Sequence, residues 1–352
     1  MSEKAKLETS PGDWCYVNNF KDPYYPKKLS LQQGGAEIFK NEIGKLIEEV
    51  KNALIKAFES KEYANKRQNI IEEFQQKEIE LFKDIYKKAS DSNFAIRRTP
   101  IEIIVIPTDD NNTPIVDKKF RKLDKKKQGE ILEKQRKFKE ELISLLRKNL
   151  DLERASNTSL MQLEENVALY AIESLLEELQ KKYKEFNDVL NYLDDVKNDI
   201  IKHLGDFLDG VKNQGRIYTQ QRDQRYMKYE VNVITNHADL KGAPILMELN
   251  PTYNNLFGKV ERESDMGTFI TNFTLIRGGA LHKANGGYLI IPIKELLLNY
   301  FSWDSLKRAL KNNKVIIEDV SERFGFLSTK SLKPAPIPLN VQIILIGSPR
   351  LY

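Results

Sequence analysis

The sequence predicts an α/β fold with a large helical coiled-coil insertion. After residue 216, apolar runs of strand length alternate with helical stretches, which is the pattern of a partly parallel sheet covered by helices. Between residues 36 and 215, apolar residues instead recur at steps of three and four, as they do in long amphipathic helices. We therefore expect 1–35 to form the first part of an α/β core, 36–215 the insertion, and 216–352 the remainder of the core.

The charge composition argues against nucleic acid as a partner. Among 352 residues, 56 are basic and 51 acidic, so the net charge of +5 is a small difference between two large populations. We therefore expect no nucleic-acid binding, although a salt-sensitive nucleic-acid-binding protein remains a third option. The basic run is expected to be a solvated face; it comprises Lys118, Lys119, Arg121, Lys122, Lys125, Lys126 and Lys127.

Neither a membrane span nor a signal peptide is predicted. No run approaches the roughly 20 apolar residues that cross a bilayer. The segment Met1 to Pro11 is polar and lacks the apolar centre of a signal peptide. We expect a cytoplasmic protein that makes no membrane contact.

Cysteine and histidine usage predicts no metal site. Cys15 is the single cysteine, so the chain has no internal disulfide framework and no multi-cysteine zinc site. It lies in the apolar stretch Trp14 to Val17, where we expect a buried structural thiol rather than a reactive one. His203, His237 and His282 are far apart in the sequence and have no metal-ligand spacing.

The N-terminal half begins with one strand and then becomes helical. Trp14 to Asn18 reads as a strand. Ala36 to Ser90 contains no proline and has amphipathic periodicity, which predicts a helix broken near Ser60. Phe94 to Arg97 and Ile101 to Ile106 are bounded by prolines and predict a small β-hairpin near 93–107.

A heptad pattern follows the hairpin. Helix is expected from Asp124 to Leu150 and again from Asn157 to Leu208. The second stretch predicts an antiparallel or oligomeric coiled coil, which makes a non-enzymatic scaffold or partner-binding protein the alternative function. The apolar seam alternates steps of three and four at Leu169, Ile172, Leu176, Leu179, Tyr183, Phe186, Leu190 and Leu193.

The C-terminal part is rich in strand signals. Two short apolar runs, Tyr288 to Ile291 and Val341 to Ile346, have the composition of central, buried strands. Helical stretches separate several of the runs, which favours parallel pairing. Further strands are expected at Tyr229 to Val233, Pro244 to Leu249, Phe269 to Ile276 and Val315 to Ile317.

The C-terminal part contains an ordered series of short motifs. They are Asn250 to Gly258, Gly267-Thr268-Phe269, Gly278 to Ile291, with Ala284-Asn285-Gly286-Gly287-Tyr288 inside it, and Val341 to Ser348. This series resembles the AAA+ module of Lon-like ATP-dependent proteases, in the branch that carries a long helical insertion. The front segment Asp13 to Pro23 resembles the piece that follows the phosphate-loop helix in that branch.

The resemblance implies nucleotide-site positions at the ends of two strands. The strand Tyr288 to Ile291 corresponds to the Walker B strand, which should be followed by one acid that organises Mg²⁺ and a second that activates water. Pro292 and Ile293 occupy those places, so neither role is filled; Glu295 is a weaker substitute. Ser348 is the nearest match to the polar sensor residue, and a plain loop serine is the alternative.

Other parts of the family's machinery have no counterpart in this sequence. No glycine cluster fits a Walker A loop, which the resemblance would place before residue 1. The Ser-Lys dyad belongs to a domain that would follow Tyr352. The resemblance thus implies a partial ATPase region, hydrolysis-deficient and without peptidase activity. ATP and Mg²⁺ serve the parent family, with weak or no binding expected in this chain alone.

The resemblance also implies partners. The parent family forms hexameric rings, so we expect a homo-oligomer that handles unfolded protein substrate. Met266 and Phe269 are the candidates for gripping substrate in the central pore, with ordinary core packing as the alternative. Arg277 and Lys283 could meet a neighbouring subunit's nucleotide or simply be solvated. His282 is expected to make a structural hydrogen bond.

Overall fold

The structure is a computed structural model that describes residues 2–98, 103–109, 113–115, 120, 124–212, 224–265, 268–318 and 331–349. It divides into two compact units, one made of Met1–Ile55 with Ala171–Tyr352 and the other of Lys56–Tyr170. We call them the core unit and the helical unit. The domain limits expected at 35/36 and 215/216 stay a prediction.

An antiparallel sheet opens the core unit. After helix α1 (Ser2–Leu7), strand β1 (Asp13–Val17) pairs with β2 (Lys27–Leu31) on one side and β5 (Val231–Val233) on the other. The predicted first strand is therefore confirmed. Cys15 on β1 is fully buried, and this burial, followed by the charge of Asp13, raises the pKa of its thiol to about 12. The thiol is structural, as expected.

A three-stranded parallel sheet confirms the predicted α/β class. Its order is β14 (Gln342–Ile346), β11 (Tyr288–Pro292) and β6 (Ile245–Met247). Leu289 on the central strand lies opposite Ile343 and Leu246 on its neighbours. Because side chains alternate along a strand, these three residues share one face of the sheet.

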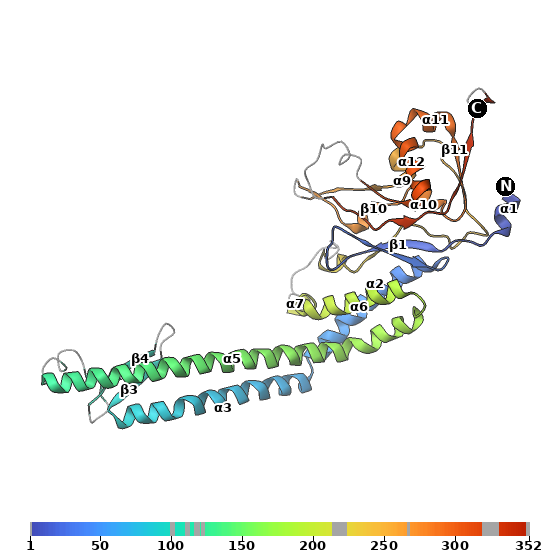
Figure 1. The fold of residues 1–352 in the computed structure, drawn as a ribbon. Helices are drawn as coiled ribbons and strands as arrows, with labels where there is room; N and C mark the ends of the chain where they lie inside the picture. The colour runs from blue at the N-terminus through green and yellow to red at the C-terminus, as the bar shows by residue number, and fades with distance from the viewer. Residues whose placement is uncertain are drawn as a thin grey trace. The chain divides into compact units, whose positions relative to one another are not determined.

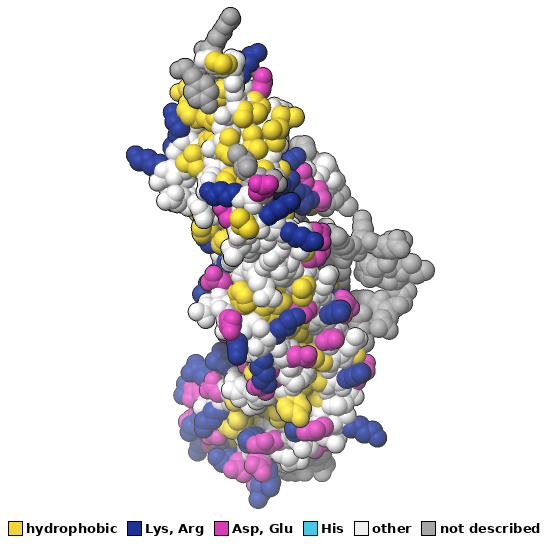
Figure 2. Space-filling model, turned by 90° about the vertical axis from the view of Figure 1, so that its right-hand side faces the viewer, with side chains coloured by type: hydrophobic (Ala, Val, Ile, Leu, Met, Phe, Trp, Pro, Cys, Tyr) yellow, Lys and Arg dark blue, Asp and Glu magenta, His cyan; other side chains and the backbone are white. Residues whose placement is uncertain are grey.

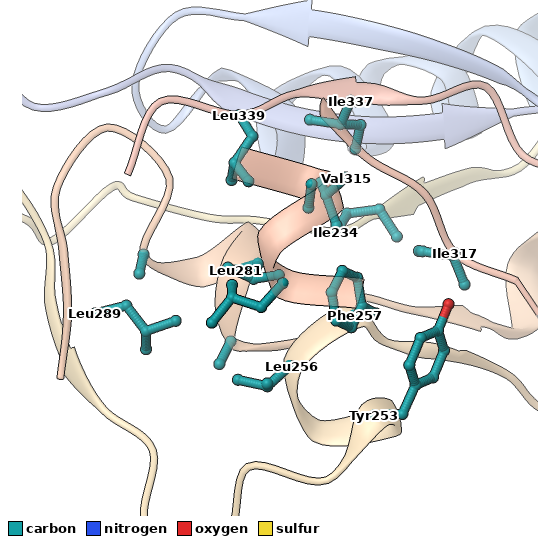
Figure 3. Close-up of a cluster of buried hydrophobic side chains, with 14 of the residues drawn as sticks. Ile234, Tyr253, Leu256, Phe257, Leu281, Leu289, Val315, Ile317, Ile337 and Leu339 are labelled. Atoms are coloured by element: carbon teal, nitrogen blue, oxygen red, sulfur yellow. The ribbon is translucent and has the colours of Figure 1, made fainter. Parts of the chain in front are cut away.

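Four helices cover that face and enclose the main core. They are α9 (Tyr253–Phe257), α10 (Ala280–Lys283), α11 (Ile293–Leu298) and α12 (Tyr300–Asn312), and Figure 1 shows α10, α11 and α12 on one side of β11. Leu289 and Ile291 of β11 are fully buried in this cluster. Figure 3 shows Leu256, Phe257 and Leu281 converging with Leu289 and Val315.

Short two-stranded ribbons complete the core unit. The ribbons pair β7 (Lys259–Val260) with β10 (Ile276–Arg277), β8 (Glu263–Asp265) with β9 (Thr268–Ile270), and β12 (Lys314–Val315) with β13 (Ile337–Pro338).

The single strand expected from Phe269 to Ile276 is wrong, because a 3₁₀ turn, η1 (Phe273–Leu275), interrupts it. Asn272 caps this turn by accepting a hydrogen bond from the Thr274 backbone N–H at 2.8 Å, which competes with strand pairing.

The helical unit is a helical hairpin with a β-hairpin, as the sequence predicts. Helix α2 (Gly35–Phe58) ends before Ser60, whose hydroxyl accepts from the Tyr63 N–H and begins α3 (Lys61–Asp91). Strands β3 (Phe94–Arg98) and β4 (Ile103–Pro107) follow and pair antiparallel. Helices α3 and α5 run side by side (Figure 1), and their core comprises Phe82, Ile85, Ala89, Phe94, Val105, Phe138 and Leu142.

The helix boundaries expected between residues 124 and 208 are wrong in two places. Helix α5 (Lys125–Lys182) runs through the break expected between Leu150 and Asn157. The chain then turns before α6 (Asn187–Lys202), α7 (Leu204–Lys212) and α8 (Gln224–Met227).

The turn interrupts the heptad seam, so the single helix expected from Asn157 to Leu208 is wrong. Tyr183 and Tyr192, on either side of the turn, both contact the Phe39 ring of α2, at centroid distances of 5.1 and 6.2 Å. The Tyr183 hydroxyl also donates to Glu42 Oε2 at 2.8 Å. Ile172, Leu176 and Leu193 of the seam are buried in the core unit, which explains why these positions are apolar.

No helix in the described part of the chain has both the length and the apolar character that a bilayer crossing requires.

Candidate functional site

The carboxyl ends of the parallel strands bring three of the predicted site residues to one edge of the sheet. Strand β11 ends at Pro292, which lies opposite Ile346 of β14. Helix α11 begins at the next residue, Ile293, and the exposed Ser348 lies two residues beyond β14. In open α/β sheets, ligands bind in the crevice outside this edge. This edge is therefore the candidate site.

The side chains of Pro292 and Ile293 contribute no oxygen or charge to the site. Pro292 occupies the N-cap position of α11 with φ −65° and makes no side-chain capping bond. Mg²⁺ is held through carboxylate oxygens, phosphates and water, and the activation of water requires a base. A pyrrolidine ring and a branched alkyl side chain provide neither function.

Two carboxylates lie near this edge, and sequence reasoning missed one of them. Glu295 lies in the first turn of α11 and is partly exposed. A negative charge is stabilised there by the dipole at the helix N-terminus. Glu248 directly follows β6, whereas the strand expected from Pro244 to Leu249 places it inside the strand. Its Oε1 accepts from the Asn250 N–H at 2.9 Å. The described residues contain no group of three or more His, Cys, Asp or Glu placed to hold a metal ion.

The Asn-Gly-Gly motif before β11 has a structural role in positioning this edge. The Asn285 side chain donates to the Pro338 carbonyl at 2.7 Å and accepts from the Asn340 N–H at 2.8 Å. Gly286 has φ +82°, and a Cβ on Gly287 would lie 2.2 Å from the Pro244 carbonyl oxygen. The motif therefore permits the close approach that aligns β11 with its neighbours.

His282 makes the structural hydrogen bond that the sequence predicts. It is fully buried, and its Nδ1 accepts from the Gly279 N–H at 3.2 Å. Its Nε2 is buried without a hydrogen-bond partner among the described residues. Burial lowers the pKa of this imidazole to about 4, so it is neutral at physiological pH.

Three of the four residues expected to meet substrate or a neighbouring subunit lie in the described part of the chain. Met266 lies outside the described residues, and Phe269 is placed by its backbone in β9, opposite Ser264. Arg277 donates from Nε to Glu261 Oε2 at 2.9 Å, so it has a partner within the chain. Lys283 is exposed at the end of α10.

A second group of polar residues, not predicted from the sequence, surrounds Asp199 of α6. Its carboxylate accepts from the Tyr229 hydroxyl at 2.7 Å, and it pairs with Lys228 at 2.7 Å and with His203 at 3.1 Å. The group borders a cavity of about 550 Å³ that Phe20, Phe273 and other residues line. Burial and then the bond to Asp199 raise the pKa of the Tyr229 phenol. The periodicity of α6 places His203 one turn after Asp199, which is the signal that could have revealed the pair.

Comparison with known families identifies two segments. Residues 241–352 match a family model described as the LonB-like AAA domain. Residues 13–46 match a second model, described as the Lon-like LonC helical domain. No curated protein matches the chain. The resemblance to Lon-like proteases, including the AAA+ module, is thereby confirmed.

Proposed function

We propose, from the match of residues 241–352 to a LonB-like AAA domain, that this chain is the ATPase region of a Lon-like protease and that it does not hydrolyse ATP. The observation that carries the proposal is the end of β11, where the side chains of Pro292 and Ile293 provide no carboxylate. The resemblance to Lon-like proteases implies that these are the positions of the two Walker B acids. The neighbouring carboxylate of Glu248 already accepts a backbone hydrogen bond, which supports the absence of a substitute.

In this proposal the chain contributes structure and substrate handling to a Lon-like protease. Unfolded polypeptide is the substrate class, a hexameric ring is the assembly, and the cytoplasm is the compartment. The helical insertion handles substrates or forms a gate. ATP and Mg²⁺ bind weakly or not at all, because the parallel sheet edge presents a proline and an isoleucine where the parent family presents acids.

The alternative function, a scaffold assembled through the heptad seam, has less support. Ile172, Leu176 and Tyr183 of the seam are buried within the chain itself. A seam that is already covered offers little apolar area for a partner helix.

ATP hydrolysis by the purified chain tests the proposal. We expect no phosphate release above the buffer background in the presence of Mg²⁺. Turnover at ordinary motor rates that is lost on Glu295→Gln or Glu248→Gln would overturn it. Lys294→Gln, an exposed neighbour of Glu295 on α11, is the matched control and should change nothing.

A further inference from the structure

Helix α5 carries an apolar stripe that the hairpin does not bury. Five large hydrophobic side chains of α5 are more than half exposed; apart from Tyr170, they follow one another at intervals of 11, 7 and 11 residues. Since each helical residue advances about 100°, these intervals return to within about 20° of the same side. We call this line of residues the α5 stripe; it comprises Leu132, Ile143, Leu150 and Met161, exposed by 54%, 53%, 51% and 63%.

The stripe is distinct from the face that packs against α3. Phe138 and Leu142 of α5 are buried in the hairpin core. They lie about 100° around the helix from the stripe. Helix α5 is therefore apolar on two sides, and packing within the helical hairpin of α3 and α5 covers one of them.

Basic residues alternate with the apolar residues along the stripe. On the same side of the helix lie Arg136, Lys139, Arg147 and Arg154. Arg136 and Arg154 form ion pairs of 3.7 and 3.5 Å with Glu140 and Asp151, all of them highly exposed. Such exposed pairs contribute little. Lys139 and Arg147 make no ion pair with any described residue.

The charges exclude a second copy of this helix as the occupant. In an antiparallel pair that superposes the apolar positions, Lys139 of one helix faces Arg154 of the other, and the two Arg147 side chains meet near the twofold axis. A parallel pair in register places every basic residue beside its own copy. Like charges that face each other across a pair of helices oppose association.

The narrow width of the α5 stripe also argues against a flat anionic surface, such as a bilayer or a nucleic acid, as its binding partner. The apolar line is one residue wide, and Glu133, Glu140 and Asp151 border it along one side. A bilayer surface or a nucleic acid would meet these carboxylates together with the basic residues. A narrow seam of alternating character instead fits another helix.

We propose that the α5 stripe binds a helical segment of a partner protein whose apolar residues alternate with acidic ones. The stripe spans 30 residues from Leu132 to Met161, or about 44 Å along the helix axis, so it accommodates about eight turns of such a helix. Apolar contacts supply the attraction and the basic residues select for acidic partners. The proposal uses residues of the helical unit alone and does not depend on the ATPase assignment.

Two synthetic 30-residue helical peptides test the proposal on the full chain by fluorescence anisotropy. The acidic probe has Leu at the positions that face the apolar residues of the α5 stripe and Glu at the positions between them. The basic probe has Lys in place of each Glu. We expect the acidic probe to bind at least about tenfold more tightly than the basic probe at low salt. Equal binding of the two probes, or binding of neither, would overturn the proposal.

Variants of the full chain sharpen the test. Lys139→Glu with Arg147→Glu should reverse the preference toward the basic probe, and Ile143→Ser with Leu150→Ser should weaken both probes about tenfold. The matched control is Lys137→Glu with Lys148→Glu, which changes equally exposed residues on another side of α5 and should preserve the preference. Circular dichroism checks that each variant is folded.

Alternative occupants give results that contradict the proposal. The same chain is mixed with phosphatidylserine vesicles and with duplex DNA. Binding to either that is lost in Lys139→Glu with Arg147→Glu, while the acidic probe does not bind, would assign the stripe to that surface instead.

Discussion

Buried polar side chains fix the local geometry of the core unit. Asp13 is fully buried; its two oxygens accept from the His237 N–H at 2.8 Å and from the Ala36 N–H at 3.2 Å. The second bond satisfies a free donor at the start of α2, so this carboxylate joins β1 to the beginning of the helical stretch. Asp199 plays a comparable part at the end of α6, where three donors converge on it.

Removing the Asp199 carboxylate should destabilise the chain. Asp199→Ala leaves the Tyr229 hydroxyl and Lys228 without their acceptor, and we expect the free energy of unfolding to fall by about 2 kcal/mol in urea titrations. Tyr229→Phe, which removes a single donor, should cost about 1 kcal/mol. The control Asp194→Ala, at an exposed pair with Lys197, should stay within about 0.5 kcal/mol, and an equal effect at the two aspartates would contradict the prediction.

His282 should make the stability depend on pH in the acid range. Its pKa is about 4 in the folded chain and 6.5 in the reference state, so the unfolded chain binds the proton first. Stability is therefore complete above pH 6.5 and falls as the pH drops toward 4. His282→Asn keeps an acceptor for Gly279, and it should shrink the difference in unfolding free energy between pH 7 and 4.5 by about 2 to 3 kcal/mol.

The comparison that checks this is urea unfolding at both pH values. His203→Asn is the control, because its side chain is 39% exposed. An unchanged pH dependence in His282→Asn would show that this imidazole does not titrate with folding.

At the scale of elements, some helix ends follow from local signals and others do not. Ser60 ends one helix and starts the next through its own hydroxyl, a signal visible in the sequence. The turn between α5 and α6 lies instead inside an unbroken apolar periodicity. It exists because Tyr183 and Tyr192 both pack on Phe39, a residue some 150 positions earlier in the chain.

The part of the seam before this turn should behave as an intramolecular core. Leu176 is 2% exposed, and Leu176→Ala should lower the free energy of unfolding by about 3 kcal/mol because it leaves a cavity. Light scattering should show the same mass as for the parent chain. Leu169→Ala, at a residue 36% exposed, is the control with an expected cost below about 1 kcal/mol. A large drop in mass on Leu176→Ala would support the oligomeric coiled coil instead.

At the scale of the whole molecule, the parallel sheet is covered on one face only in part. Tyr288 and Ile344 pack against Ala5 of α1, yet Met247 and Ile346 on the same face are 50% and 42% exposed. Figure 2 shows apolar side chains gathered on the core unit near the C-terminal strand. Parallel sheets are ordinarily buried on both faces, so this face is an unusually apolar surface.

Polar substitution of this face should reduce its exposed apolar surface without unfolding the chain. We expect Met247→Thr with Ile346→Thr to lower the fluorescence of a bound hydrophobic dye and to reduce self-association in concentrated solution. The free energy of unfolding should change by less than about 1 kcal/mol, because both side chains are about half exposed. Tyr170→Ser, at a residue 86% exposed in the helical unit, serves as the control; equal dye binding by all three proteins would refute the expectation.

The candidate site could be predicted in part. The order of apolar runs predicted that Pro292, Ile293 and Ser348 would follow parallel strands, and parallel strands bring their carboxyl ends together. Glu248 was missed because the end of β6 depends on its pairing with β11 and not on its own composition. The Asp199 group was missed because its members come from α6 and from the residues before β5.

The sequence alone determined the α/β class, the β-hairpin, the break at Ser60 and the absence of acids directly after β11. These features depend on local periodicity, capping and residue type, which neighbouring residues specify. Only the tertiary structure decided where the heptad seam ends, which side of α5 stays uncovered and which donors reach Asp199. Those features depend on contacts between residues distant in the chain, whose packing energy overrides local preference.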